Sequence, residues 1–141
     1  MLTRLLYVST AVGPITTAVT GTILRSAQKH NAASGITGVL CQGRSVYLQV
    51  LEGERSHVDA LYQRIALDQR HQNLVLRQQE DIARRRYGKW AMAHVDMALL
   101  DHAEAAQQPP AFDPYHATAE EIMAKLDALI AAGNVMESPI G

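Results

Sequence analysis

Two patterns of apolar and polar positions alternate along residues 1–95. Short apolar runs have the length of buried strands, and the stretches between them repeat apolar residues at helical spacing. Between the second and third runs, the tripeptide Gln42-Gly43-Arg44 predicts a tight antiparallel hairpin. The predicted strands are Leu5–Ser9, Ile36–Cys41, Ser45–Leu51, Asn73–Gln79 and Tyr87–Val95.

Two amphipathic helices are predicted between these strands. The first runs from about Thr20 to Asn31, and the polar Asn31 ends its apolar face. The second begins at Ser56, because Asp59 three residues later completes a capping-box pattern. Its apolar stripe consists of Val58, Leu61, Tyr62 and Ile65.

This order of elements predicts an α+β fold, a ferredoxin-like βαββαββ sandwich with both helices on one face of the sheet. Such a topology places the first and third strands side by side in the middle of the sheet. Tyr7 and Gln49 would then lie on neighbouring strands. If both side chains point to the helix side, they meet beneath the helices.

After Val95 the composition shifts, so we expect one domain over residues 1–95 and a C-terminal helical extension over residues 96–141. Met97–Ala106 has the pattern of a short helix. Gln107–Pro114 carries three prolines, which break any regular element.

A further helix is predicted to begin at Thr118, because Glu121 completes a capping box. Its apolar stripe has to pack either on the sheet face that the first two helices leave open or on another chain. If the sheet does not cover it, the stripe is a possible contact for a partner. The stripe consists of Ile122, Leu126, Leu129 and Ile130.

Composition narrows the classes of partner and compartment. The 141 residues carry a net charge of −1, which favours neither nucleic acid nor an anionic membrane as a general partner. No apolar run approaches the roughly 18 to 20 residues of a membrane span. The single cysteine, Cys41, excludes an intramolecular disulfide and fits a reducing compartment. We therefore expect a cytoplasmic protein.

Enzymatic and metal-binding motifs are missing from the sequence. The six histidines show no ligand spacing with carboxylates or with Cys41, so no metal site is expected. No glycine-rich phosphate loop and no nucleophile beside a base can be recognised. The pattern indicates a protein that is not an enzyme.

Gln49 is the most unusual residue, because its amide interrupts an apolar run that reads as a central strand. A buried amide without hydrogen bonds costs about 1 to 3 kcal/mol, so Gln49 needs a structural mate or a ligand. In the last predicted strand, Trp90 and Met92 alternate with alanines and are expected to share one face. Together with Tyr7 and Asn31, these residues offer a planar, edge-polar heterocycle both donors and acceptors.

Each of these residues also has a purely structural interpretation. Tyr7 could border the core, Asn31 could cap its helix, and Trp90 and Met92 could be core packing. In a ligand-free interaction module, Gln49 would be satisfied by Tyr7 alone.

Two charged clusters have similar alternatives. The group formed by Arg64, Asp68, Arg70 and His71 at the end of the second helix could hold a phosphate or ribityl chain, or could be an ordinary charged helix end. The basic run 84–86 resembles an anion-binding patch, but a solvated turn is the favoured interpretation.

Over Leu2–Val95 the chain resembles the BLUF domain family, blue-light sensors that use FAD. The resemblance rests on motifs that occur in order and at the spacing of the family. They are Leu6-Tyr7-Val8-Ser9, His30-Asn31 followed by Gly35-Ile36-Thr37-Gly38, Leu48-Gln49-Val50-Leu51-Glu52-Gly53, Asp68-Gln69-Arg70-His71 and Trp90-Ala91-Met92.

The resemblance implies that FAD lies between the two helices with its ring over the sheet. Tyr7 would then be the electron and proton donor to the photoexcited flavin. Gln49 would be the switch between Tyr7 and the flavin, because rotation or tautomerisation of an amide exchanges a donor for an acceptor. Asn31 would hydrogen-bond a carbonyl edge of the ring, and His30 would flank the ring.

The same resemblance gives roles to residues further from the ring. Trp90 and Met92 would exchange positions or relay the signal, and which of them lies next to the flavin is left open. The candidates for ribityl and phosphate contacts are Lys29, Arg64, Asp68, Arg70 and His71.

The extension after Val95 is too short for a catalytic domain, so the chain resembles the stand-alone members of the family. Such a sensor would signal to a separate effector protein or through a change in self-association. The alternatives are a small ferredoxin-like flavin-dependent enzyme and a ligand-free interaction module. The sequence leaves open whether FMN can replace FAD.

Overall fold

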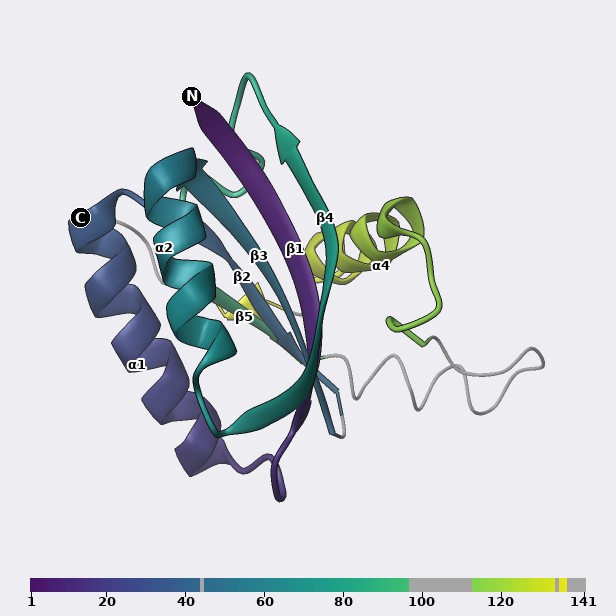
Figure 1. Cartoon of the computed structure of the whole chain (residues 1–141). Helices are drawn as coiled ribbons and strands as arrows, with labels where there is room; N and C mark the ends of the chain where they lie inside the picture. Colours follow the sequence, from purple (N-terminus) through teal and green to yellow (C-terminus); the bar gives the residue numbers. More distant parts are fainter. Residues whose placement is uncertain (44, 97–112, 134, 137–141) are drawn as a thin grey trace.

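A six-stranded sheet with helices on both faces forms the body of the molecule, in the strand order β4-β1-β3-β2-β5-β6. The computed structural model describes residues 1–43, 45–96, 113–133 and 135–136. Figure 1 shows α1 and α2 side by side on one face of the sheet and α4 on the other. The elements are β1 Leu2–Ala11, α1 Thr17–Ser34, β2 Thr37–Gln42, β3 Val46–Glu54, α2 Arg55–Ala66, β4 His71–Asp81, β5 Ala93–Asp96, α4 Ala119–Ala131 and β6 Val135–Met136.

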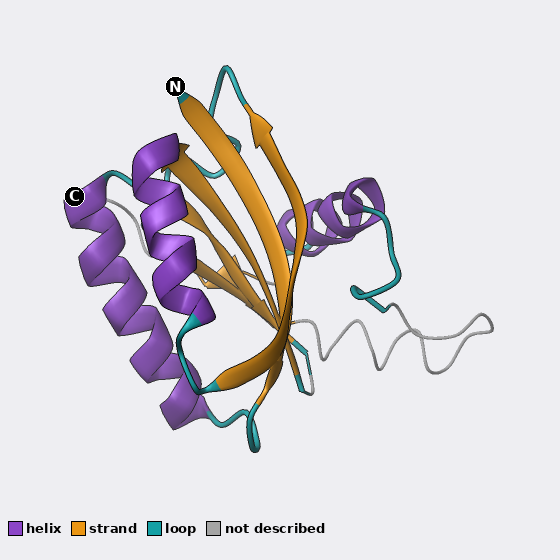
Figure 2. Cartoon of the chain, viewed as in Figure 1, coloured by secondary structure: helices purple, strands orange, loops and turns teal. Residues whose placement is uncertain are grey.

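The two central strands confirm the predicted topology. Strands β1 and β3 pair antiparallel, and Tyr7 lies directly opposite Gln49. Strands β2 and β3 form the predicted hairpin. The α+β, ferredoxin-like arrangement is therefore confirmed, with two helices on one face (Figure 2).

Alternation along β3 divides the apolar residues between two cores. Leu48 and Val50 belong to the cluster under α4, whereas Tyr47 and Leu51 belong to the cluster under α1 and α2. Side chains on adjacent positions of a strand point to opposite faces, so one strand supplies both layers. Gln49 shares its face with Tyr47 and Leu51, which places its amide under the two helices.

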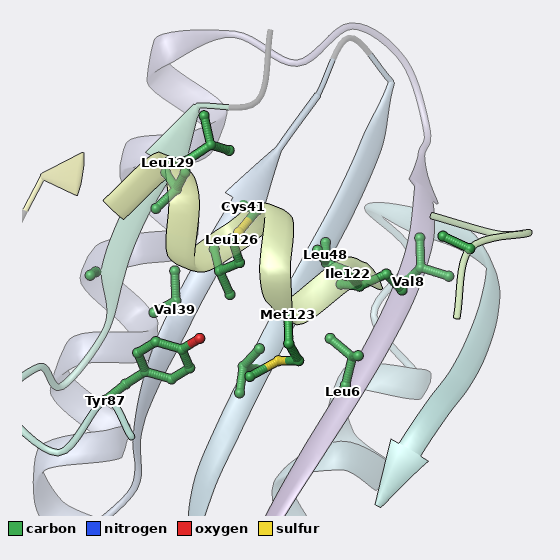
Figure 3. Packing of buried hydrophobic residues seen from close by; sticks show 14 residues of the cluster. Leu6, Val8, Val39, Cys41, Leu48, Tyr87, Ile122, Met123, Leu126 and Leu129 are labelled. Atoms are coloured by element: carbon green, nitrogen blue, oxygen red, sulfur yellow. The ribbon is translucent and has the colours of Figure 1, made fainter. Parts of the chain in front are cut away.

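The tail helix α4 packs on the sheet of its own chain. The hydroxyl of Thr118 accepts a hydrogen bond from the backbone N–H of Glu121 at 3.1 Å, which confirms the predicted cap. The apolar stripe of α4 covers side chains of the central strands, as Figure 3 shows for Ile122, Leu126 and Leu129. Of the two partners expected for the stripe, the sheet is the one observed. The helix expected over Met97–Ala106, and residues 107–112 of the proline-containing stretch, lie outside the described residues.

Two helix boundaries differ from the prediction. Helix α2 begins at Arg55 directly after β3, with Glu54 as its N-cap and no side-chain cap, so the capping box at Ser56 was wrong. The chain passes from strand to helix without a loop in which Ser56 could cap. Helix α1 continues to Ser34 and ends at Gly35, whose φ of 65° is one that glycine adopts without strain. Asn31 therefore lies inside the helix and is not its cap.

The last predicted strand is only partly correct. Strand β5 covers Ala93–Asp96, whereas residues 87–92 form turns and bends with one isolated bridge at Trp90. The backbone N–H of Gly38 donates to the carbonyl of Trp90 at 3.1 Å. Because residues 87–92 are not a strand, the alternation expected for Trp90 and Met92 does not apply to them.

Candidate ligand-binding site

A pocket lies between α1 and α2 over the central strands. Its empty volume is about 830 Å³, including the space that opens to solvent at its mouth. It brings together most of the residues predicted from the sequence, namely Tyr7, His30, Asn31, Gln49, Arg64, Asp68, Arg70 and His71.

Tyr7 and Gln49 are joined at the floor of this pocket. The Tyr7 hydroxyl donates to Gln49 Oε1 at 2.5 Å, and the two residues are only 4% and 5% exposed. Burial raises the pKa of the Tyr7 phenol far above its ordinary value, and the nearby Asp68 carboxylate adds to the effect. The phenol is therefore neutral and available as a proton donor.

The other end of the Gln49 amide contacts Met92. Gln49 Nε2 donates to Met92 Sδ at 3.4 Å, and Met92 is fully buried. A thioether is a weak acceptor, so this is the weaker of the two contacts of the amide. Tyr7, Gln49 and Met92 thus form a short chain of hydrogen bonds across the sheet.

Asn31 has an unused acceptor in the same pocket. Its Nδ2 donates to the carbonyl of Ala91 at 3.0 Å, whereas Oδ1 is buried and has no hydrogen-bond partner. An unsatisfied buried acceptor costs about 1 to 3 kcal/mol. A ligand with an N–H group at its edge would remove this cost, and a flavin ring has such an edge.

Trp90 and Met92 lie in different cores. Met92 belongs to the cluster under α1 and α2, whereas Trp90 packs against the cluster under α4. The indole stacks on the Tyr87 ring, with 6.2 Å between centroids and 13° between planes. The expectation that Trp90 and Met92 share one face is therefore wrong, and Met92 is the residue next to Gln49.

Charged groups gather at the end of the pocket formed by the segment after α2. Asp68 follows the helix end at Ala66, and its carboxylate accepts from the Arg70 side chain at 2.5 to 3.0 Å. This contact lowers the pKa of the Asp68 carboxyl. Arg64 is exposed and lines the same pocket, so cationic and anionic groups both face a ligand here.

His71 is fixed by two hydrogen bonds at this end. Its Nε2 lies 2.7 Å from the carbonyl oxygen of Ile65, and its Nδ1 lies 2.7 Å from Ser9 Oγ. A carbonyl only accepts, so Nε2 carries a proton. The ring meets Tyr7 edge-on with 6.3 Å between centroids, which makes His71 part of the pocket wall.

Of the two remaining predicted residues, one lines the pocket and the other does not. His30 is exposed and lines the pocket, whereas Lys29 is exposed and does not. Tyr47 lines the pocket but was not predicted, although it lies two residues before Gln49 on the same face of β3. That period-2 relation could have revealed it. Burial raises the pKa of the Tyr47 phenol, against the opposing charge of Arg70.

The basic run differs in part from the favoured solvated turn. Arg84 is exposed, but Arg85 is half-buried, and its guanidinium donates to Thr37 Oγ1 at 3.1 Å and to the carbonyl of Glu52 at 3.2 Å.

Within the described ranges, no group of three or more His, Cys, Asp or Glu residues could hold a metal. No helix in that part of the chain is long and apolar enough to cross a membrane.

Comparison with known proteins identifies a family that matches most of this chain. The family model described as sensors of blue light using FAD, BLUF, matches residues 2–93. Photoactivated adenylate cyclase subunit beta of Euglena gracilis is 32% identical over 100 residues, which are 70% of this chain and 12% of the relative. The blue light- and temperature-regulated antirepressor BluF of Escherichia coli K12 is 33% identical over 81 residues, 57% of this chain and 20% of the relative.

Two solved structures resemble this chain over nearly the whole length of both proteins. BlrB, a BLUF protein in its dark state, is 29% identical with a TM-score of 0.76, and the match covers 94% of this chain and 96% of BlrB. The photo-activated state of BlsA is 26% identical with a TM-score of 0.83, covering 98% and 99% of the two chains. The family model, these relatives and the pocket agree, and the chain belongs to the BLUF family of blue-light sensors that use FAD.

Proposed function

We propose that this protein is a blue-light photoreceptor that binds FAD non-covalently between α1 and α2. The observation that carries the proposal is the Tyr7–Gln49–Met92 chain of hydrogen bonds beside the unpaired Asn31 Oδ1. Bound FAD would supply blue-light absorption and an excited ring that accepts an electron. The protein supplies the donor, the switch and the walls of the site.

Contacts to the cofactor are proposed for the residues that line the pocket. Asn31 Oδ1 is suited to accept from a ring N–H, and Gln49 has its amide at the floor of the site. His30 also lines the pocket and is proposed to flank the ring. At the charged end, the candidates for ribityl and phosphate contacts are Arg64, Asp68, Arg70 and His71. Lys29 is left out of this set because it does not line the pocket.

Tyr7 is proposed as the electron and proton donor. Its phenol is neutral and its proton already lies on the line to Gln49 Oε1. A phenol that loses an electron becomes a strong acid, so the Oη proton is released toward the amide oxygen. The Tyr7 ring belongs to the apolar cluster under α1 and α2.

Gln49 is proposed as the element that stores the light signal. If the amide rotates, Nε2 takes the place of Oε1 beside Tyr7, and the oxygen turns toward Met92 Sδ. The thioether accepts from an N–H but gains nothing from an amide oxygen, so the Gln49–Met92 contact is lost. No formal charge moves, and the record of light is a changed pattern of hydrogen bonds.

The ligand-free alternative is partly consistent with the geometry, since Tyr7 and Gln49 do satisfy each other. It leaves the Asn31 Oδ1 and the pocket without a purpose, which favours the photoreceptor. The chain spans between 7% and 12% of the length of the cyclase relatives that it matches, so their catalytic activity gives no reason to propose an enzyme here. We propose that the output goes to a separate effector protein, because the α4 stripe is covered by its own sheet.

Absorption spectra before and after blue light test the proposal. The purified 141-residue chain should be yellow, release FAD on denaturation and show a reversible red shift of the flavin band after illumination. A colourless protein, or a yellow one whose spectrum blue light does not change, would contradict it.

A further inference from the structure

The segment Arg86–Met92 contacts both the photoactive site and the tail helix. Its last residues lie at Gln49, and its first residues are bonded to Asp127 of α4. We propose that Asp127 is the residue through which α4 follows the state of the Gln49 switch. The inference rests on the proposed photoreceptor function and names a residue that transmits the light signal to α4.

At the photoactive end, side-chain amides hold the segment. Asn31 Nδ2 donates to the carbonyl of Ala91 at 3.0 Å, and Gln28 Nε2 donates to the carbonyl of Met92 at 3.2 Å. Gln49 Nε2 holds the Met92 sulfur. The backbone at Ala91 and Met92 is therefore held by α1. A rearrangement of Gln49 changes the contact of one side chain on this backbone, that of Met92.

In its first part, the segment is fastened to the sheet by a buried carboxylate. Glu52 is fully buried, and its side chain accepts from the backbone N–H of Tyr87 at 2.7 Å and of Arg86 at 2.9 Å. Arg4 Nε completes the site at 2.9 Å and balances the charge. A buried carboxylate is tolerated only with such partners, so the backbone at residues 86–87 is a fixed point.

The side chains at that fixed point contact α4. The Tyr87 hydroxyl donates to Asp127 Oδ1 at 3.0 Å, and Arg86 lies 3.3 Å from Oδ2. Tyr87 is buried in the cluster under α4, and its ring stacks on Trp90 two residues before Met92. Figure 3 shows the Tyr87 ring next to α4 and close to Val39.

These contacts differ in kind from the apolar packing of α4 on the sheet. Apolar packing on the sheet is non-directional and does not by itself fix the place of any one polar group of the helix. The Asp127 bonds are directional, because they require the Tyr87 hydroxyl at one place. A displacement of Met92 and Trp90 changes the position of the Tyr87 ring about its fixed backbone, and Asp127 transfers the change to α4.

Amide hydrogen exchange of residues 119–131, in the dark and under blue light, tests the inference on the full-length FAD-bound protein. In the wild type, illumination should change exchange in α4 by about fivefold, as expected for one gained or lost hydrogen bond. The variants Tyr87→Phe and Asp127→Asn should both keep the flavin red shift. Tyr87→Phe removes the donating hydroxyl and should lose most of this light-minus-dark difference, whereas Asp127→Asn keeps an acceptor for that hydroxyl, loses the ion pair with Arg86 and should lose part of the difference. Tyr87→Phe retains the ring that stacks on Trp90, so this variant tests the contribution of the hydroxyl alone. It remains informative even if Asp127→Asn loosens α4 in the dark.

Glu120→Gln is the matched control, because Glu120 is exposed on the same helix and its replacement also removes one negative charge. It should behave as the wild type. A full light-minus-dark difference in Tyr87→Phe and Asp127→Asn would overturn the role of Asp127, and so would a wild type whose α4 shows no difference despite a normal red shift. A wild type without any red shift would instead refute the photoreceptor itself.

Discussion

Gln49 is the residue on which the account depends, because each end of its amide has a different partner. Oε1 accepts from a neutral phenol, and Nε2 donates to a thioether. Only an amide presents an acceptor and a donor of similar size at the two ends of one rotatable group. A carboxylate at this place could not make the second contact, and a leucine could make neither.

Replacing Tyr7 by Phe should leave a yellow protein that does not respond to light. The variant keeps the ring that fills the core but loses the hydroxyl that donates to Gln49 Oε1. The measurement is the absorption spectrum before and after blue light. Tyr62→Phe is the control, since its ring lies 5.9 Å from that of Tyr7 and it should respond normally. A normal red shift in Tyr7→Phe would refute Tyr7 as the donor.

Replacing Met92 by Ala should preserve the red-shifted state and change its lifetime. The side chain is fully buried, so stability should also fall by about 2 to 5 kcal/mol. Recovery in the dark after a blue pulse gives the lifetime, and chemical denaturation gives the stability. Met123→Ala removes a buried methionine on the opposite face and should lower stability alone. Unchanged recovery in Met92→Ala would remove this residue from the relay.

At the level of elements, the hairpin of β2 and β3 depends on a close approach of the two backbones at Gly38. A Cβ atom added at Gly38 would lie 1.9 Å from the carbonyl oxygen of Val50, so only glycine fits opposite β3. The backbone N–H of the same residue holds the carbonyl of Trp90. Gly38 thus serves both the hairpin and the segment that carries Met92.

Gly38→Ala should therefore destabilise the fold by about 3 kcal/mol, because backbone atoms cannot move aside as a flexible side chain can. Denaturation with urea measures the loss. At Gly88, an added Cβ would meet only side-chain atoms of Arg85 at 3.3 and 3.6 Å, so Gly88→Ala should be mild. Equal losses in the two variants would show that the contact with Val50 does not matter.

The elements also show what the sequence could and could not predict. Periodicity and the hairpin turn were enough to place Tyr7 and Gln49 on neighbouring strands. The register that sets the two residues directly opposite each other was left open by the sequence and is given by the structure. Trp90 and Met92 were misplaced because a period-2 rule was applied to a segment whose backbone bonds are made by Gly38, Asn31 and Gln28. Partners such as Glu52 and Asp127 come from distant parts of the chain, and no local pattern reports them.

On the scale of the whole molecule, the sheet separates two cores, one under α1 and α2 and one under α4. The side under α1 and α2 holds the polar pocket, and the side under α4 holds a second apolar cluster. The segment Arg86–Met92 reaches from one to the other. Tyr7 and Tyr87, one in each core, both have pKa values raised mainly by burial, so each core depends on a neutral phenol.

This burial predicts alkaline instability. The unfolded phenols titrate near the ordinary value of 10.0 while the folded ones stay neutral, so the free energy of unfolding should fall as the pH rises above that value. Each such phenol contributes about 1.4 kcal/mol per pH unit. Denaturation from pH 9 to 11 should show a smaller slope for Tyr87→Phe than for the wild type or Tyr115→Phe. An identical slope in all three proteins would contradict the prediction.

The light-minus-dark absorption spectrum of Gln49→Leu, recorded beside the wild type, tests the central claim most directly. The account predicts that both proteins bind FAD and are yellow, that the wild type shows a reversible red shift, and that the variant shows none. Since leucine fills the same space without an amide, a wild-type red shift in Gln49→Leu would contradict the assignment of Gln49 as the switch.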